Sequence, residues 1–300
     1  MKGGSRVSPL VSSKGMEMNP FTGVGVGLRR PHLEQVAALD ASPVPFWEIA
    51  PENVVGQGGS RHRQVMKILE RGPVLTHGLS MSIGGYDAWD RDVLDSLKGF
   101  LKETKSPWHS EHLCWTSFGG ATTHELLPMP FTRDAVKHTV ERAKRIQSEL
   151  PVPFLFENVS YYAALGEPEM SEKDFFAEVL EGADCGWLLD INNIYVNSRN
   201  FGFDAREWLE GMPLDRVRQM HIAGHTWFEE DQLIIDTHGA AVIDPVIELM
   251  QWVLPRIGRP VPVLLERDND IPGLEILLAE RASLQKAYDA AFEPAGARHD

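Results

Sequence analysis

The chain has few of the features that mark secreted, zinc-ribbon or membrane proteins. Among 300 residues there are only two cysteines, Cys114 and Cys185, too few for a disulfide framework or a zinc ribbon. No apolar run approaches the roughly 18 residues that a membrane-spanning helix needs, and the N-terminus has no continuous apolar signal segment. We therefore expect a cytoplasmic protein without membrane association, in which both thiols are packed rather than reactive.

Positive charge is also scarce. Lysine and arginine number 29 against 43 aspartates and glutamates, so the formal net charge is −14. A surface this acidic repels a phosphate backbone, and we expect no nucleic-acid partner.

Linker composition is confined to the two ends of the chain. Residues 1–20 are rich in Gly, Ser and Met without periodicity and predict a flexible N-terminal arm, and residues 291–300 predict a flexible tail. No Pro/Gly/Ser linker interrupts residues 21–290, and 43% of the chain is apolar, which is ample for one large core. We expect a single domain.

Short apolar, β-prone runs alternate with amphipathic helical segments along this domain. Eight such runs lie at 23–28, 45–51, 72–79, 107–115, 153–158, 186–192, 216–224 and 261–267. Helical periodicity marks 32–40, 60–71, 90–103, 132–149, 171–182, 244–257 and 272–292. Eightfold alternation predicts a (β/α)8 TIM barrel, with a doubly wound open sheet as the alternative.

Metal-ligand side chains follow most of these runs where each strand would end. In chain order they are His77, His109 and His112, Glu157, Asp190 with Asn193, His221 with His225, and Glu266. Asp236 and His238 lie in the connection after the seventh run. A TIM barrel gathers the C-terminal ends of its strands at one face, so the pattern predicts a metal centre there.

The number of ligands exceeds what one ion needs. Four carboxylates (Glu157, Asp190, Asp236, Glu266) and four histidines (His77, His112, His221, His238) suit two or three ions that share a bridging carboxylate. Oxygen and nitrogen ligands without thiolate favour iron, manganese or zinc. Three divalent ions would outweigh four carboxylates, and the positive excess would attract an anion such as a thiolate, phosphate or enediolate.

Six segments between about Gly23 and Leu278 resemble a known family: SEHLCW, FENVSYY, LLDINNIYVNSRNFGFD, MHIAGH, IDTHG and LLERDND. They are similar to the MbnB-like multinuclear non-haem iron enzymes, relatives of methanobactin and thiaglutamate biosynthesis oxidases and formerly a family of unknown function. The resemblance implies a xylose-isomerase-like TIM barrel with two or three iron ions (Fe2+/Fe3+), for which zinc or manganese could substitute. It also implies a cysteine-containing precursor peptide as substrate and a small leader-binding partner protein.

The resemblance assigns nine metal ligands and no catalytic residue beyond them: His77, His112, Glu157, Asp190, Asn193, His221, Asp236, His238 and Glu266. Glu157 would bridge two ions. Asp190, His221 and Glu266 would complete the second ion, and Asn193, Asp236 and His238 would hold the third.

Two positions leave alternatives open. Asn192 could replace Asn193, because strand alternation would place Asn192 on the same face as Asp190. Arg267 stands where the family motif has an aromatic residue, and it either pairs with the substrate or faces a helix.

These expectations favour an iron-dependent oxidase or oxygenase that uses dioxygen to modify cysteines of a ribosomally synthesised peptide. One alternative is a redox-inert TIM-barrel enzyme, either a sugar isomerase or epimerase or a phosphodiesterase. The acidic surface argues against a nuclease, and no lysine base follows a strand. A second alternative is a metal-binding partner protein without turnover.

Overall fold

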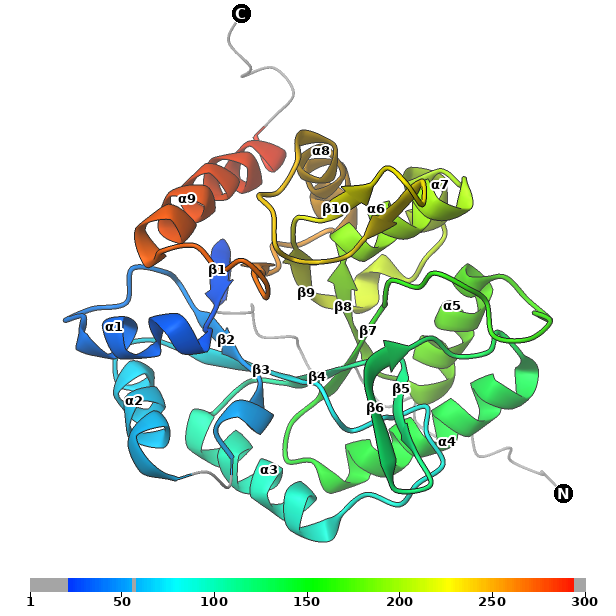
Figure 1. Cartoon of the computed structure of the whole chain (residues 1–300), viewed down its shortest axis with the longest axis horizontal. Helices are drawn as coiled ribbons and strands as arrows, with labels where there is room; N and C mark the ends of the chain where they lie inside the picture. Colours follow the sequence, from blue (N-terminus) through cyan, green and yellow to red (C-terminus); the bar gives the residue numbers. More distant parts are fainter. Residues whose placement is uncertain (1–20, 56–57, 294–300) are drawn as a thin grey trace, which may run out of the picture.

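Eight parallel strands close into a barrel in the computed structural model, which describes residues 21–55 and 58–293 (Figure 1). The barrel strands are β1 (Val24–Gly27), β2 (Trp47–Ile49), β3 (Val74–Gly78), β4 (His109–His112), β7 (Phe154–Glu157), β8 (Gly186–Asp190), β9 (Val217–Ile222) and β12 (Val263–Leu265). They follow one another in chain order, and β1 pairs with β12 to close the ring. The predicted (β/α)8 barrel is confirmed.

Helices surround the barrel, one or more after most strands (Figure 1). They are α1 (Leu33–Ala38), α2 (Gly59–Leu69), α3 (Arg91–Thr104), α4 (Arg133–Glu149), α5 (Glu172–Ala183), α6 (Ile191–Phe201), α7 (Ala205–Leu209), α8 (Asp244–Val253) and α9 (Leu274–Ala291). Short 3-10 turns lie at Arg30–His32, Pro51–Asn53, Leu214–Arg216 and Leu254–Ile257. Side-chain caps fix several helix starts: Asp90, Thr132 and Ser171 accept hydrogen bonds from the first-turn amides of α3, α4 and α5.

Strand alternation divides the barrel interior into two layers. The lower layer is an apolar floor of Phe46, Leu75, Trp108, Leu155, Leu188 and Leu264. Two residues after five of these floor positions the inward side chains are polar: Glu48, His77, Glu157, Asp190 and Glu266. His221 on β9 follows the buried Gln219 by the same spacing. A second, larger core fills the space between the barrel and its helices.

Glycine in β1 leaves room for this floor. A Cβ atom at Gly25 would lie 2.4 Å from the Phe46 ring, so only glycine lets that ring fill the barrel beside β1. β1 therefore contributes packing space, whereas its neighbours contribute polar side chains.

The structure corrects two expected strands. β4 ends at His112, before Cys114, and the antiparallel hairpin β5 (Trp115–Phe118) and β6 (Ala121–Leu127) follows it. β8 ends at Asp190, because the Asp190 carboxylate caps α6 by accepting from the Asn193 amide at 2.6 Å. Residues 191–192 are thus helical, not strand.

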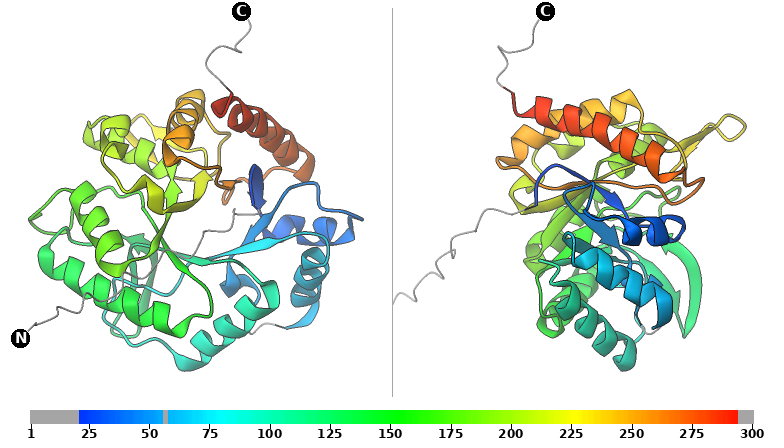
Figure 2. Two further views of the ribbon diagram at one scale, coloured as in Figure 1. Left: turned by 180° about the vertical axis from the view of Figure 1, so that it is seen from behind. Right: turned by 90° about the vertical axis from the view of Figure 1, so that its left-hand side faces the viewer.

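A second hairpin, β10 (Thr226–Phe228) and β11 (Leu233–Ile235), follows β9. The right-hand view of Figure 2 shows both hairpins projecting from the same end of the barrel. That end is the one at which the metal-ligand side chains were predicted.

The chain ends agree only partly with the expected domain limits. The predicted arm 1–20 lies outside the described residues, and so does most of the predicted tail, whereas Ala291 is the last residue of α9. Within the described residues no helix is both long and apolar enough to cross a membrane. Cys114 and Cys185 are buried, and burial raises the pKa of both thiols.

Candidate metal centre

A cavity of about 460 Å³ opens at the C-terminal end of the barrel. Seven of the nine predicted ligands line it: His77, His112, Glu157, Asn193, Asp236, His238 and Glu266. The other two, Asp190 and His221, are fully buried. All nine therefore lie in or directly beneath one cavity.

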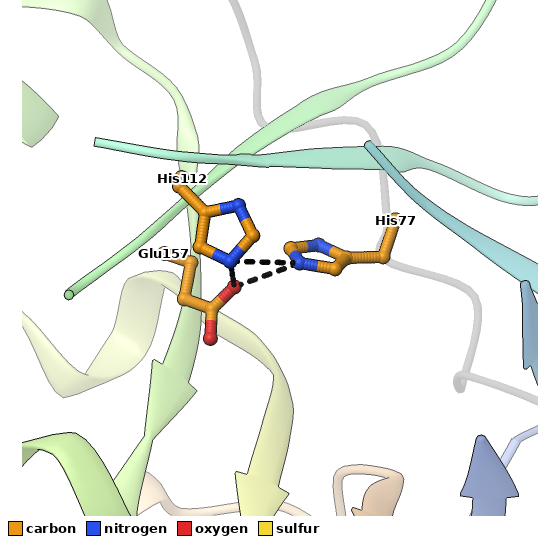
Figure 3. A group of neighbouring side chains, drawn as sticks. All are labelled: His77, His112 and Glu157. Carbon is orange, nitrogen blue, oxygen red and sulfur yellow. Dashed lines mark hydrogen bonds and ion pairs between the residues drawn. The ribbon is translucent and has the colours of Figure 1, made fainter. Parts of the chain in front are cut away.

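Three of these side chains form a first group, His77, His112 and Glu157, on β3, β4 and β7 (Figure 3). The Glu157 Oε2 atom lies 3.0 Å from His77 Nε2 and 3.3 Å from His112 Nε2. The two Nε2 atoms are 3.3 Å apart. Ser110 fixes the His77 ring by a 2.9 Å hydrogen bond at Nδ1, so Nε2 faces the other two side chains.

A second group contains Glu157, Asp190, His221 and Glu266. His221 Nδ1 lies 3.4 Å from Glu157 Oε1 and 3.1 Å from Glu266 Oε2. Glu157 thus presents one carboxylate oxygen to each group. This is the geometry that a carboxylate bridging two ions requires.

His238 forms a third group with Glu266 and Asp268, beside the second group, and it also contacts Asp236. Its Nε2 atom is 2.8 Å from Asp236 Oδ1, and its Nδ1 atom is 2.9 Å from Asp268 Oδ2 and 3.5 Å from Glu266 Oε2. Arg29 also holds Asp268, at 2.5 Å. A third ion could be bound on either side of the His238 ring.

The structure distinguishes the two asparagines at the start of α6. The Asn192 side chain is fully engaged, because its Nδ2 donates to Asp236 and its Oδ1 contacts His225 Nδ1. Asn193 donates through Nδ2 to the Asn158 carbonyl and lines the cavity. The strand-alternation argument for Asn192 was wrong, because both residues are helical.

Buried atoms without hydrogen bonds test whether this set suits metal ions. Within residues 21–55 and 58–293, six buried atoms of the predicted ligands make no hydrogen bond. One is His112 Nδ1, on the side of the ring opposite the first group, and the other five face the groups: Glu157 Oε2, Asp190 Oδ2, Asn193 Oδ1, His221 Nδ1 and His238 Nε2. The contacts of Glu157 Oε2, His221 Nδ1 and His238 Nε2 given above are imidazole–carboxylate ion pairs, which require a protonated ring. Buried polar atoms are normally satisfied. Five such atoms around one cavity are the arrangement that cations would satisfy, so the residues fit a metal centre.

The pKa values of the buried histidines and of Glu157 depend on their mutual charge interactions. Burial opposes ionisation of His77 and His221, but carboxylates raise the pKa of both: chiefly Glu157 for His77, and chiefly Glu48 for His221. Burial likewise opposes ionisation of Glu157, but its three histidine neighbours hold its pKa below the usual range. The raised pKa values favour protonated His77 and His221, whereas burial lowers the pKa of His112, and cations bound by His77 and His221 would displace those protons.

Sequence reasoning missed four charged residues that line the cavity: Arg29, Glu48, Asp268 and the exposed Glu125. Glu48 contacts His221 at 3.1 Å, and Arg29 pairs with Glu266 at 2.9 Å as well as with Asp268. Glu48 follows the inward-facing Phe46 by two residues, as Glu266 follows Leu264. That spacing was the signal that could have found it.

Three other residues flagged in the sequence have structural contacts. His109 lies in β4 with its Nδ1 3.2 Å from the Thr76 hydroxyl, outside the three groups. His225 stacks on Tyr195 and contacts Asn192. Arg267 faces α9, where it pairs with Glu280 at 2.5 Å, which excludes the substrate-pairing alternative in this conformation.

Solved structures similar to this chain share its fold. L-ribulose 3-epimerase aligns with a TM-score of 0.57 and 13% identity, over 93% of this chain and all of that one. D-psicose 3-epimerase of Clostridium cellulolyticum H10 aligns at 0.55 and 12%, over 91% and 100%. A xylose isomerase-like TIM barrel protein of Mycobacterium smegmatis, in complex with magnesium, aligns at 0.54 and 11%, over 88% and 89%. The barrel is xylose-isomerase-like, as expected.

Relatives by sequence are much more similar. A UPF0276 protein of Pseudomonas aeruginosa is 44% identical over 265 residues, which is 88% of this chain and 92% of that protein. One from Caulobacter vibrioides is 42% identical over 265 residues, 88% and 94% of the two chains. The model of RiPP precursor modification enzymes MbnB/TglH/ChrH matches residues 23–289. The chain therefore belongs to the MbnB/TglH/ChrH family of RiPP precursor modification enzymes.

Proposed function

We propose that this protein is a multinuclear iron-dependent oxidative enzyme that uses dioxygen to modify cysteine residues of a ribosomally synthesised peptide. The observation that carries the proposal is the pair of buried ligand groups joined through Glu157, in a family of peptide-precursor modification enzymes. A joined centre of this kind suits two or three ions better than one.

We assign the ligands to individual ions from the groups of neighbouring side chains and from the buried atoms that make no hydrogen bond. We assign one ion to the first group and one to the second, with Glu157 between them. We assign a third ion to Asn193, Asp236 and His238, because Asn193 Oδ1 and His238 Nε2 are buried without a hydrogen bond and Asp236 Oδ1 lies 2.8 Å from His238 Nε2. On this assignment Asp268 orients the His238 ring through Nδ1 and is not itself a ligand.

Charge supports an anionic substrate group, although less strongly than the sequence suggested. Three divalent ions carry six positive charges, against six carboxylates and one arginine in or next to the three groups: Glu48, Glu157, Asp190, Asp236, Glu266, Asp268 and Arg29. Glu125, exposed at the cavity wall, is not counted. The excess is about one charge rather than two, and one thiolate would neutralise it.

The iron, when bound, would supply dioxygen activation and acidify a cysteine thiol. The chain supplies the surroundings. The apolar floor excludes water from below, and the exposed side chains of Leu79, Leu126 and Tyr162 surround the cavity mouth, where they offer apolar contact to a peptide.

The test is turnover with and without dioxygen. Protein reconstituted with ferrous iron under argon is incubated with the cysteine-bearing peptide encoded beside its gene, and the peptide mass is followed in argon and in air. A small partner protein encoded nearby is added in a parallel arm to deliver the leader segment. We expect more than one iron per chain and a mass change only in air.

The competing functions give different outcomes. A redox-inert isomerase, epimerase or phosphodiesterase would work under argon and equally well with zinc or manganese, on sugars or phosphodiesters. A metal-binding partner protein would bind ions and leave every substrate unchanged with its partner present.

A further inference from the structure

We propose that Glu48 is a positioning residue that fixes the orientation and the tautomer of His221, so that Nδ1 and not Nε2 faces the second metal group. This inference rests on the proposed metal centre and adds to it a residue outside the ligand set. Glu48 does not belong to any of the groups of side chains that could hold an ion.

The contacts of the His221 ring are the first support. Its Nε2 atom lies 3.1 Å from Glu48 Oε1 and 3.2 Å from both Glu48 Oε2 and Gln219 Nε2, while its Nδ1 atom faces Glu157 and Glu266. Gln219 Nε2 donates to Glu48 Oε2, so the Glu48 carboxylate is the acceptor available to a proton on His221 Nε2. Both ring nitrogens therefore lie near carboxylates, and the ring has no free edge. A proton on Nε2 directed at Glu48 leaves the Nδ1 lone pair directed at the second group.

Glu48 is itself held in place from below. Gln219 donates through Nε2 to Glu48 Oε2, and Gln219 Oε1 accepts from Trp108 Nε1 at 2.7 Å. Trp108 belongs to the apolar floor, and Gln219 is fully buried. This chain of hydrogen bonds from floor to ligand fixes the carboxylate, so Glu48 provides a rigid acceptor rather than a mobile charge.

The Glu48–His221 contact is buried, which increases the effect of removing Glu48. Glu48 is 1% exposed and His221 is fully buried, so the acceptor beside Nε2 is this fixed carboxylate and not bulk water. Without Glu48 the ring could adopt the other tautomer or turn over, and either change would remove Nδ1 from the second group. Partners of this kind are worth about 10–100-fold in metal affinity.

The experiment uses zinc as the probe, with neither peptide nor dioxygen present. Full-length protein labelled with ¹⁵N at histidine is loaded with zinc, and long-range ¹H–¹⁵N spectra report the tautomer of each ring. Competition with a chelator reports the affinity of each ion. We expect His221 to carry zinc on Nδ1 and a slowly exchanging proton on Nε2.

Three variants separate positioning from general disruption. Glu48→Ala should lose that proton signal and weaken one zinc ion about 10–100-fold. Glu48→Gln keeps an acceptor oxygen, so it should keep the tautomer and lose less affinity. Glu111→Ala is the control, because Glu111 is an equally buried strand glutamate that contacts His109 rather than a proposed ligand.

Several results would overturn the proposal. These are a proton on Nδ1 in the wild type, an unchanged affinity and tautomer in Glu48→Ala, or an equal loss in Glu111→Ala. Wild-type protein that binds fewer than two zinc ions would contradict the metal centre itself. Normal wild-type binding with an unaffected Glu48→Ala variant would contradict only the role of Glu48.

Discussion

At the scale of single residues, Glu157 is the ligand that we expect to be hardest to replace. Its two oxygens face different groups, so removing its charge would leave two cations close together without the negative charge that screens them. Glu157→Gln keeps the shape, and we expect it to lose at least one ion per chain by elemental analysis. Glu111→Gln, on the neighbouring strand, should retain all ions; full retention in Glu157→Gln would move the bridging role to Asp190 or Glu266.

Glu172 offers a prediction about pH that does not involve the metal ligands. Burial raises its pKa to about 7 despite hydrogen bonds from Tyr161 and Asn197. The folded state keeps this proton until about pH 7 and the unfolded state releases it near 4.5, so the contribution to stability falls as the pH rises between these values. Glu172→Gln removes this dependence.

Urea unfolding of both proteins in excess chelator measures the effect. Relative to wild type, the variant should gain about 3 kcal/mol in unfolding free energy between pH 4.5 and pH 8, because about 2.5 pKa units separate the two states. Parallel pH profiles for the two proteins would show that the Glu172 carboxylate titrates normally.

At the scale of elements, the loop between β11 and α8 holds what we expect to be the most weakly bound ion. Asp236 and His238 lie in this excursion and not on the barrel wall, and His238 has a positive φ of 49°. Loops preorganise ligands less well than strands do. His238→Ala should therefore lose about one ion per chain while the circular dichroism spectrum and the remaining ions are retained. Loss of every ion would show that the three groups load as one unit.

The elements also show why parts of the centre could be read from the sequence and parts could not. His77, Glu157 and Glu266 end apolar strands, where a change from apolar to ligand side chain is visible in one dimension. Glu48 was missed because β2 is only three residues long and its ligand-like carboxylate looks like an ordinary interruption. α6 was missed because Asp190 ends a strand and caps a helix at once.

The β5–β6 hairpin is a similar case. Its turn is made by Gly119 and Gly120, both with positive φ, but a glycine pair is equally typical of an open loop. The β6 strand is exposed on both faces, so its side chains do not alternate between core and solvent. Its sequence therefore lacks the alternating hydrophobic pattern from which a strand is predicted.

At the scale of the whole molecule, the alternation of strand-like and helical segments predicted the barrel correctly. The barrel itself does not identify the function. Two sugar epimerases share this fold at 12–13% identity, so the architecture leaves the chemistry open. The reactions differ in the polar side chains above the apolar floor. Measuring which metal ions these side chains bind is therefore the way to distinguish the reactions.

Bound ions should contribute measurably to the stability of the entire fold. Removing them leaves seven carboxylates in and around one cavity, and among the described residues that line it the compensating charges are Arg29 and protons on histidines. An ion at 1,000 times its dissociation constant stabilises the fold by about 4 kcal/mol, which corresponds to roughly 10 °C in Tm. Calorimetry with and without a chelator should show a drop of this order, and an unchanged Tm would mean that the cavity binds ions only weakly.

The apolar floor of the barrel bears on the order in which metal ions and peptide bind. Phe46, Trp108 and Leu264 with their neighbours fill the barrel below the ligands, so among the described residues the centre opens through the cavity at the C-terminal end of the barrel. A peptide lying across the mouth of this cavity closes the route by which ions exchange. Loading must then precede the peptide, and a bound peptide should slow the escape of iron to an external chelator.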